Sequence, residues 1–392
     1  MVNFEPSNTL KELPEQFFAK LVQKVQKLKN EGHDIINLGQ GNPDLPTPPH
    51  IVAELQTAAT QPNFHKYSPF RGYGFLKEAI CAYYKREYNV ELDPNSEVAV
   101  LFGAKSGLVE ISRCILNPGD TVLVPDPGYP DYWSGIALAQ GKMAFMPLLK
   151  ENHFLPDYTK LDNDILKKSK LMFLNYPNNP TAATATTDFF DKTVEIARKH
   201  HICVVHDFAY GSIGYDGVKP PSFLQSEGAK DVGVEMYTLS KTYNMAGWRV
   251  AFAVGNPSVI EHLNLLQDHI HCSLFGGIQK AAAEALTGDQ RSAVELRRTY
   301  ESRRDTFIKH LNTIGWKVES PKGSFFCWLP VPKEYTSEEF ADILLEKAHV
   351  MTAPGNGFGK FGEGFLRVGL LDTEERLVEA VRRIEKLGIF TY

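Results

Sequence analysis

Residues 237–249 read Tyr237-Thr238-Leu239-Ser240-Lys241-Thr242-Tyr243-Asn244-Met245-Ala246-Gly247-Trp248-Arg249. An apolar, strand-like run ends near Lys241, and Arg249 follows eight residues later. A lysine amine can hold a carbonyl compound as a Schiff base, and hydroxyls together with a guanidinium group suit a phosphate. Lysines near arginines are more often solvated surface charges, so this interpretation needs support from other parts of the chain.

Short apolar runs rich in branched residues recur along the chain on both sides of this segment. They lie at 98–102, 121–124, 171–174, 202–205, 236–239 and 250–254. Most neighbouring runs are separated by stretches that can hold a helix, which is typical of a largely parallel sheet covered by helices on both faces. We therefore expect an α/β fold with its ligand at the carboxyl ends of the strands.

The two ends of the chain depart from this pattern. Apolar residues at helical spacing predict a helix over 17–29 that stops near Gly32, followed by a short strand over 35–38. Helical patterns continue from Pro257 to about residue 314, and strands are predicted at 316–319, 325–329 and 365–368. We expect an N-terminal segment (1–44) joined to a small C-terminal α/β domain (286–392), and a large ligand-binding domain (45–285) between them.

The composition is that of an ordinary globular protein. The 392 residues include 47 acidic and 42 basic side chains with no block of like charge, so neither nucleic acid nor a membrane is an expected partner. The N-terminus lacks the pattern of a secretory leader and no apolar run could cross a bilayer, which predicts a cytoplasmic protein. The His-Ile-His-Cys run at 269–272 matches no zinc pattern, so no metal is expected. The scattered cysteines predict free thiols; they are Cys81, Cys114, Cys203, Cys272 and Cys327.

A glycine-containing turn, Gly103-Ala104-Lys105-Ser106-Gly107, follows the predicted strand at 98–102 and precedes a helix-like run at 108–115. Glycine lets backbone amides approach an anion, and the start of a helix adds free N–H groups and a favourable dipole. Many strand-to-helix turns contain glycine, however, and Lys105 alone could equally be a solvated turn residue.

Polar residues also follow two further predicted strands. Asn179 lies in Asn175-Tyr176-Pro177-Asn178-Asn179-Pro180-Thr181, where two prolines could hold it rigidly as a hydrogen-bond donor, although turn chemistry explains the same pattern. Asp207 ends an apolar run and Tyr210 follows it. A buried carboxylate needs a partner, and a protonated pyridine nitrogen would be one, with Tyr210 donating to the ring hydroxyl. Alone, Asp207 would be interpreted as a helix cap.

These four groups together resemble the class I and II aminotransferases of the fold type I pyridoxal-phosphate enzymes, over nearly the whole chain. The resemblance implies pyridoxal 5'-phosphate as cofactor, held covalently by Lys241, with Asp207 on the pyridine nitrogen and Asn179 and Tyr210 at the ring hydroxyl. Tyr132, after Asp126-Pro127-Gly128-Tyr129-Pro130, would stack on the ring. The phosphate would be held by hydroxyls, amides and a guanidinium, namely those of Gly103, Ala104, Lys105, Thr238, Ser240 and Arg249.

The resemblance also implies how substrate and partner are bound. Arg367, in Gly364-Phe365-Leu366-Arg367-Val368-Gly369, would grip the substrate carboxylate, a task that suits a forked guanidinium. From the sequence alone, this arginine could instead be salt-bridged in an apolar strand. Gly41 and Asn179 would lie against the substrate. Tyr67 would reach the phosphate of a neighbouring subunit, which implies a homodimer with shared active sites.

Two positions depart from the family pattern. Thr238 stands where the family usually has serine or glycine, which keeps a hydroxyl and adds a methyl group. Ala182 stands where a glycine usually follows Asn-Pro-Thr. If that turn requires a positive φ, Ala182 introduces strain.

The expected reaction moves an amino group between an L-amino acid and a 2-oxo acid, with Lys241, Asp207 and Tyr210 as catalytic residues and the Lys241 amine moving a proton at the substrate α-carbon. No second arginine is obviously dedicated to a distal carboxylate, although Arg71 or Lys105 could serve. The helix that begins near Phe17 could bring apolar side chains over the pocket. A moderately apolar substrate side chain is therefore favoured.

The chain looks most like bacterial methionine-salvage aminotransferases, with LL-diaminopimelate aminotransferases as relatives, so amination of 4-methylthio-2-oxobutanoate to methionine is predicted. Aspartate, alanine, aromatic or LL-diaminopimelate aminotransferases remain alternatives, and a pyridoxal-phosphate C–S lyase would use the same anchor residues. A non-catalytic sensor is disfavoured because no basic DNA-binding segment is expected ahead of the fold. A nucleotide-binding protein is disfavoured because no phosphate-loop or three-glycine motif follows the first strand.

Overall fold

The computed structural model describes residues 1–14 and 17–390 of the chain. Its helices are α1 (Asn8–Lys11), α2 (Phe17–Asn30), α3 (Pro49–Ala59), α4 (Gly74–Tyr88), α5 (Ala104–Ile115), α6 (Asp131–Leu138), α7 (Asn163–Lys168), α8 (Thr187–His200), α9 (Ala229–Val232), α10 (Leu239–Thr242), α11 (Pro257–Ile270), α12 (Gly276–Thr287), α13 (Arg291–Thr313), α14 (Ser337–Ala348) and α15 (Glu374–Glu385). Its strands are β1 (Ile36–Asn37), β2 (Val98–Leu101), β3 (Thr121–Asp126), β4 (Lys142–Pro147), β5 (Ser169–Asn175), β6 (Cys203–Asp207), β7 (Gly233–Thr238), β8 (Ala251–Gly255), β9 (Phe326–Pro330), β10 (Val350–Met351), β11 (Ala353–Pro354) and β12 (Phe365–Gly369).

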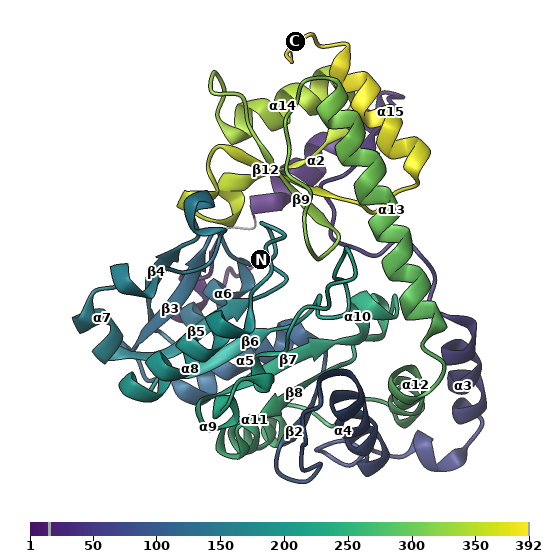
Figure 1. Cartoon of the computed structure of the whole chain (residues 1–392). Coiled ribbons are helices and arrows are strands. Elements are labelled where there is room, and N and C mark those ends of the chain that lie inside the picture. Colours follow the sequence, from purple (N-terminus) through teal and green to yellow (C-terminus); the bar gives the residue numbers. More distant parts are fainter. Residues whose placement is uncertain (15–16, 391–392) are drawn as a thin grey trace.

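A seven-stranded sheet forms the centre of the larger part of the molecule (Figure 1). Its strand order is β2-β8-β7-β6-β5-β3-β4, and among the described strands of this sheet β8 alone runs in the direction opposite to the others. Because the inner strands are buried on both faces, they are almost continuously apolar. The predicted α/β fold with a largely parallel sheet is confirmed.

Alternate residues of each strand pack on opposite layers of helices. On β5, Met172 and Leu174 belong to the core that includes α4, α8 and α12, whereas Leu171 and Phe173 belong to the core that includes α5, α6 and α11. This alternation follows from the two-residue period of a strand. Both faces of the sheet are therefore covered, and its carboxyl edge is left for a ligand.

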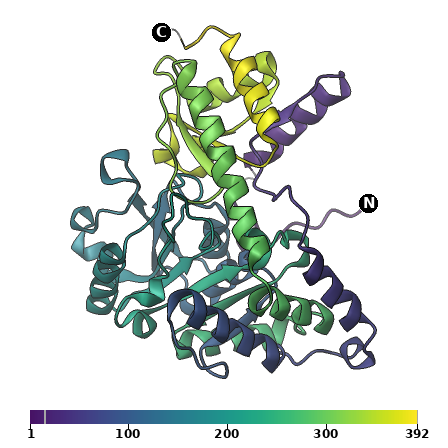
Figure 2. The same cartoon turned by 45° about the vertical axis from the view of Figure 1, so that its right-hand side comes forward.

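The smaller part of the molecule contains the C-terminal strands and helices, and the long helix α13 runs between the two parts (Figures 1 and 2). The strands β11, β12 and β9 form an antiparallel sheet, and β10 pairs in parallel with β1 from the N-terminal segment. Asp34, just before β1, accepts hydrogen bonds from Arg376 and Arg383 of α15. The N-terminal segment thus contributes a strand and an ion-pair cluster to the C-terminal part.

The strand prediction was wrong at one place and incomplete at another. Residues 316–319 were expected to form a strand, but they form none. The backbone N–H and C=O of Val318 bond instead to the side chain of Asn312, and the Trp316 indole donates to Pro330 O. Strand β4 was not predicted from the sequence, because its Lys-Met-Ala-Phe-Met-Pro run has no branched residue and lies half exposed at the sheet edge.

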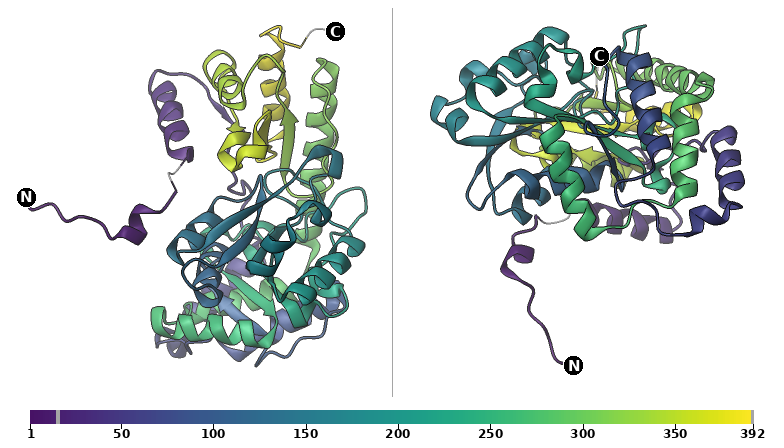
Figure 3. Two further views of the ribbon diagram at one scale, coloured as in Figure 1. Left: turned by 90° about the vertical axis from the view of Figure 1, so that its left-hand side faces the viewer. Right: turned by 90° about the horizontal axis from the view of Figure 1, so that it is seen from below.

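The N-terminal residues before α1 extend away from the body of the molecule (Figure 3). Within the described residues, no helix combines the length and the apolar character that a membrane crossing requires. All five cysteines are free, as the sequence predicts.

Candidate active site

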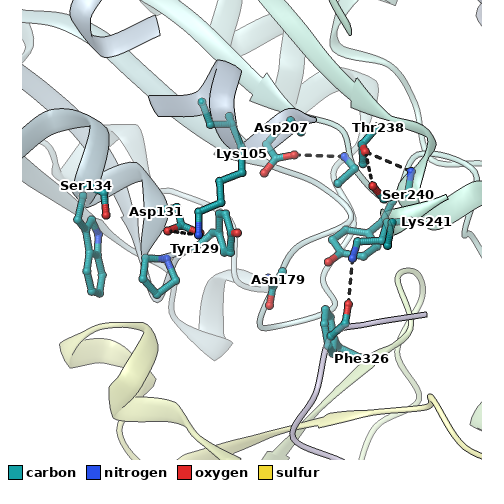
Figure 4. A pocket seen from close by; sticks show the side chains of 18 of the residues that line it. Lys105, Tyr129, Asp131, Ser134, Asn179, Asp207, Thr238, Ser240, Lys241 and Phe326 are labelled. Carbon is teal, nitrogen blue, oxygen red and sulfur yellow. Dashed lines mark hydrogen bonds and ion pairs between the residues drawn. The ribbon is translucent and has the colours of Figure 1, made fainter. Parts of the chain in front are cut away.

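A cavity of about 440 Å³ lies at the carboxyl edge of the central sheet (Figure 4). Strands β5, β6 and β7 end beside it at Asn175, Asp207 and Thr238. The wall is completed by the N-terminal start of α5, the turn α10 and residues of the smaller part, including Gly41, Phe326 and Arg367. The expected ligand position at this edge agrees with the structure.

Lys241 lies in the short helix α10, directly after β7, and its side chain points into the cavity (Figure 4). Its Nζ donates to the backbone carbonyl of Gly41 over 2.9 Å. Burial lowers the pKa of the Lys241 amine to about 8, and the positive charges of Arg367 and Arg249 act in the same direction, against the opposing effect of Asp207. The neutral form of this amine is therefore far more populated near physiological pH than that of an ordinary lysine, although most of the amine is still protonated.

Asp207 ends β6 at the base of the cavity and is only 5% exposed. Its carboxylate accepts from the Tyr132 hydroxyl over 2.8 Å and from the Ala209 amide over 3.3 Å. Burial raises the pKa of Asp207, although the Tyr132 hydrogen bond opposes that shift. A cationic N–H beside this carboxylate would favour its ionised form and oppose the upward shift of its pKa.

An anion-binding corner is formed where α5 begins. Gly103 is the N-cap of α5 with a φ of 82°, and a Cβ placed there would come within 2.2 Å of the Arg249 Nη2. The Thr238 hydroxyl donates to the Ser240 Oγ over 2.9 Å, and the Ser240 amide donates to Thr238 Oγ1. The corner combines helix-start amides, two hydroxyls and a guanidinium in one place; its lining residues are Ala104, Lys105, Thr238, Ser240 and Arg249.

The loop after β5 holds Asn179 at the cavity wall. The backbone N–H of Asn179 donates to the side-chain oxygen Oδ1 of Asn175 over 2.7 Å, and Asn175 Nδ2 in turn donates to the backbone carbonyl of Asp207. Sequence reasoning singled out Asn179 but not Asn175, whose position directly at the strand end was the available signal. Ala182 has a φ of 59°, so the turn does require a left-handed residue and alanine adopts it with some strain.

Arg367 lies in β12 and is 7% exposed. Its Nη1 donates to Asn179 Oδ1 over 2.9 Å and its Nη2 to the carbonyl of Gly39 over 2.8 Å. The guanidinium carbon also lies 4.2 Å and 4.7 Å from the ring centroids of Phe326 and Phe358. Because a guanidinium group donates hydrogen bonds and accepts none, the side-chain amide of Asn179 turns its oxygen Oδ1 toward Arg367 and its nitrogen Nδ2 away from it.

The placement of Tyr132 differs from the expectation that it stacks on a ligand ring. Tyr132 has no exposed surface, donates to Asp207 and stacks on Phe173 with ring centroids 4.7 Å apart. Tyr129, three residues earlier, lines the cavity instead. Since α6 begins at Asp131, one aromatic residue of this run faces the cavity and the other packs on β5, and the one that faces the cavity is Tyr129.

Tyr210 lines the cavity, as expected, and its ring packs edge-on against Phe325 and Phe326. Tyr67 does not belong to this cavity in its own chain, because its side chain is 90% exposed on the surface. Arg71 is engaged by Glu261 and Asp268, which removes it as a candidate for a distal carboxylate in this cavity.

Lys105 lines the cavity, but its amine forms an ion pair with Asp131 over 3.0 Å (Figure 4). Sequence reasoning did not single out Asp131, because nothing in the sequence brings the start of α6 to Lys105. The side chains of Phe17 and Phe18, which were expected over the pocket, lie outside the described residues; Pro14 does line the cavity.

The residues of the cavity fit a phosphate-bearing pyridine aldehyde. The close approach of Arg249 to Gly103 leaves a corner for an anion beside free helix-start amides. The buried Asp207 supplies the acceptor for a protonated ring nitrogen, and the partly neutral Lys241 amine supplies a nucleophile. The described residues therefore offer a binding group for the phosphate, an acceptor for the ring nitrogen and a nucleophile for the aldehyde of pyridoxal 5'-phosphate.

Comparisons with known proteins agree with this chemistry. The family model "Aminotransferase class I and II" matches residues 33–384. The L-glutamine--4-(methylsulfanyl)-2-oxobutanoate aminotransferase of Bacillus subtilis is 64% identical over 390 residues, which cover 100% of this chain and 98% of that protein. An LL-diaminopimelate aminotransferase of Moorella thermoacetica is 45% identical and covers 98% of each chain. The solved apo structure of BacF from Bacillus subtilis matches with a TM-score of 0.96 at 51% identity, covering 99% of both chains.

The family match spans most of the chain, and the fold is that of the fold type I enzymes. The expectations of an enzyme, of amino transfer between an amino acid and a 2-oxo acid, and of pyridoxal phosphate dependence are confirmed at the level of the family. The chain belongs to the class I and II aminotransferases, which depend on pyridoxal 5'-phosphate.

Proposed function

We propose that this aminotransferase aminates 4-(methylsulfanyl)-2-oxobutanoate, the compound also called 4-methylthio-2-oxobutanoate, to methionine, and that L-glutamine is its amino donor. The observation that carries the proposal is the 64% identity over the full chain to the Bacillus subtilis enzyme of that name. The cavity supports it, because the cation that could bind a distal carboxylate, Lys105, is paired with Asp131.

Pyridoxal phosphate, when bound, supplies an electron-withdrawing ring that stabilises negative charge at the substrate α-carbon. We assign Lys241 as its covalent anchor and as the base that moves a proton at that carbon, a role suited to an amine with a pKa of about 8. Asp207 would hold the proton on the ring nitrogen. Arg367 would bind the substrate α-carboxylate through its forked guanidinium, beside Asn179.

Other residues would position and shield the ligands. Tyr129 would cover the ring face, Tyr132 would hold Asp207 in place, and Tyr210 would donate to the ring hydroxyl. Gly41 offers its carbonyl to the Lys241 amine and thereby directs it toward the substrate space. The phosphate would be bound at the anion corner, by the amides of Gly103, Ala104 and Lys105, the hydroxyls of Thr238 and Ser240, and Arg249.

A panel of oxo-acid acceptors tests the substrate proposal. With glutamine as donor, we expect 4-(methylsulfanyl)-2-oxobutanoate to give the highest kcat/KM, ahead of oxaloacetate, pyruvate and phenylpyruvate. Equal rates across the panel would refute it. Release of a thiol, ammonia and 2-oxobutanoate from methionine, with no amino group passed to an acceptor, would indicate a C–S lyase.

Three broader assignments belong to the same proposal. We propose a homodimer in which Tyr67 of each chain completes the site of its partner, because that side chain is exposed in the single chain. We also propose the division into residues 1–44 with 286–392, and 45–285, which the pairing of β1 with β10 supports. A cytoplasmic location stays a prediction.

A further inference from the structure

Six charged side chains line the cavity within the described part of the chain, and four of them have assigned roles above. The other two, Lys105 and Asp131, form an ion pair over 3.0 Å. Lys105 is the second residue of α5, and Asp131 is the first residue of α6. In Figure 4 this pair lies across the cavity from Lys241, with Asn179 between them.

The position of the pair relates it to the substrate side chain. A substrate with its α-carboxylate on Arg367 and its α-carbon near Lys241 must direct its side chain toward the part of the wall that these residues leave free. That part includes the Lys105–Asp131 pair and, next to Asp131 on α6, Trp133 and Ser134. A distal polar group that extends toward α6 would meet the pair.

The two partners of the pair are not equally exposed. The Asp131 side chain is 14% exposed, whereas that of Lys105 is 56% exposed. Asp131 lies in the first turn of α6, where the helix dipole stabilises a carboxylate. The negative charge is thus fixed in the wall, and it holds the only lysine that faces this part of the described cavity.

We propose that Asp131 is a specificity-determining residue: by neutralising Lys105, it makes the wall accept neutral distal groups such as an amide or a thioether and reject a carboxylate. A distal carboxylate would have to displace Asp131 from Lys105 while lying beside its charge, and like charges at close range oppose binding strongly. This inference rests on the proposed function in one respect, namely that the physiological substrates have neutral side chains.

The test compares glutamine with glutamate, which have nearly the same shape and differ in the charge of the distal group. Each amino acid is mixed alone with the loaded enzyme, and the spectral change of the cofactor gives kcat/KM for the donor half of the reaction. For Asp131→Asn we expect the glutamate-to-glutamine ratio of kcat/KM to rise about tenfold or more, mainly through a lower KM for glutamate. Alanine, which has no distal group, measures whether the rest of the site is intact.

Two further variants separate specificity from a structural role. Lys105→Met leaves the Asp131 charge without its amine, so the glutamate-to-glutamine ratio should fall below that of the wild type, and this arm remains informative if Asp131→Asn does not fold. Glu97→Gln is the matched control, because Glu97 pairs with Lys230 over 2.8 Å, its side chain is 13% exposed, close to the 14% of Asp131, and neither residue lines the cavity. Glu97→Gln should leave the ratio unchanged.

The outcomes divide clearly. An unchanged ratio in both Asp131→Asn and Lys105→Met, or an equal loss with glutamine, glutamate and alanine in both, overturns the proposal and leaves the pair as a link between α5 and α6. Wild-type preference for glutamate overturns it as well. A wild-type enzyme that prefers glutamine but does not favour 4-(methylsulfanyl)-2-oxobutanoate refutes only the acceptor proposed above, since the donor half-reaction needs no acceptor.

Discussion

The lowered pKa of Lys241 has a consequence for the stability of the folded protein. Burial lowers its pKa to about 8 from the ordinary value of 10.5. A lysine with a lowered pKa opposes folding when it is protonated: the cost is fully present below about pH 8, and it disappears as the pH rises through 10.5. The burial that lowers the pKa of this amine therefore makes the cofactor-free protein less stable at neutral pH, where the amine is mostly protonated.

This residue gives a prediction for stability. At pH 7, the cofactor-free Lys241→Met variant should be more stable than the cofactor-free wild type by about 2 kcal/mol, because an apolar side chain of similar length removes the buried charge. The gain should vanish near pH 10.5. Denaturant unfolding at both pH values measures the difference, and a variant that is less stable at pH 7 would contradict it.

Gly103 gives a prediction for cofactor binding. In Gly103→Ala, the new methyl group would lie 2.2 Å from the Arg249 guanidinium, so that side chain must leave the anion corner. We expect the affinity for pyridoxal phosphate to fall at least about tenfold, as loss of a charge-assisted phosphate contact implies. Titration of cofactor-free protein with pyridoxal phosphate measures the affinity.

Gly119→Ala is the control for backbone strain. Gly119 has a φ of 88°, close to the 82° of Gly103, but an added Cβ would meet nothing within 4 Å. Both variants place a Cβ on a backbone with positive φ and should lose stability for that reason; the ψ of 152° at Gly103 is reached almost only by glycine, so Gly103→Ala should lose at least as much. If both lose cofactor affinity equally, strain and not displacement of Arg249 explains the effect.

At the scale of single residues, the sequence indicated which residues carry the polar side chains of the site more reliably than which way each side chain points. Lys241, Asp207, Asn179 and Arg367 each follow or occupy an apolar strand, so a polar side chain there was informative. Tyr129 and Tyr132 are three residues apart at the start of one helix, and only the packing of Tyr132 on Phe173 decides which of them is buried.

At the scale of elements, branched apolar runs located six of the seven strands of the central sheet, because strands buried on both faces have almost no other composition. The edge strand β4 was not predicted because it is not buried on both faces: Met143 and Phe145 are exposed on it. The run at 316–319 has strand-like residues, yet Asn312 satisfies the backbone that a neighbouring strand would have paired. A side chain six residues away outweighed the local propensity.

Polar residues at strand ends divide into two kinds that the sequence does not separate. Asp207 ends β6 and faces the cavity, whereas Asp126 ends β3 and accepts hydrogen bonds from the amides of Lys360 and Phe361. Gly359 is required beside it, since a Cβ there would lie 2.1 Å from Asp126 Oδ1. One carboxylate thus serves the ligand site, and the other joins the central sheet to the smaller part.

At the scale of the whole molecule, the site depends on segments that are far apart in the sequence. Gly41 comes from the N-terminal segment, Lys241 from the short helix α10 that follows the central strand β7, and Arg367 from the C-terminal sheet. Arg303 of α13 binds Asp44 with both terminal nitrogens, over 3.0 Å and 2.8 Å, and thereby fixes the segment that carries Gly41. Strand propensity could not predict this assembly, because these contacts are long-range.

The proposed homodimer extends this dependence to a second chain. Tyr67 is 90% exposed and lies near further exposed aromatic side chains, Phe70 at 56% and Phe275 at 39%. Arg71 anchors the same loop to α11 through Glu261 and Asp268, so the loop is held on the surface of its own chain. An exposed apolar region of this kind is typical of a protein–protein interface.

Hybrid dimers test whether Tyr67 acts across that interface. Lys241→Ala and Tyr67→Ala subunits, carrying different tags, are co-expressed, and the mixed dimer is isolated. If Tyr67 completes the partner's site, one site of the hybrid contains both an intact Lys241 and an intact Tyr67, and the hybrid should show about half the wild-type activity, above both parents.

A hybrid of Lys241→Ala with the Lys241→Ala/Tyr67→Ala double variant contains no lysine anchor and should stay inactive. If Tyr67 acted only within its own chain, the first hybrid would be no more active than the Tyr67→Ala parent, and the shared-site arrangement would be wrong.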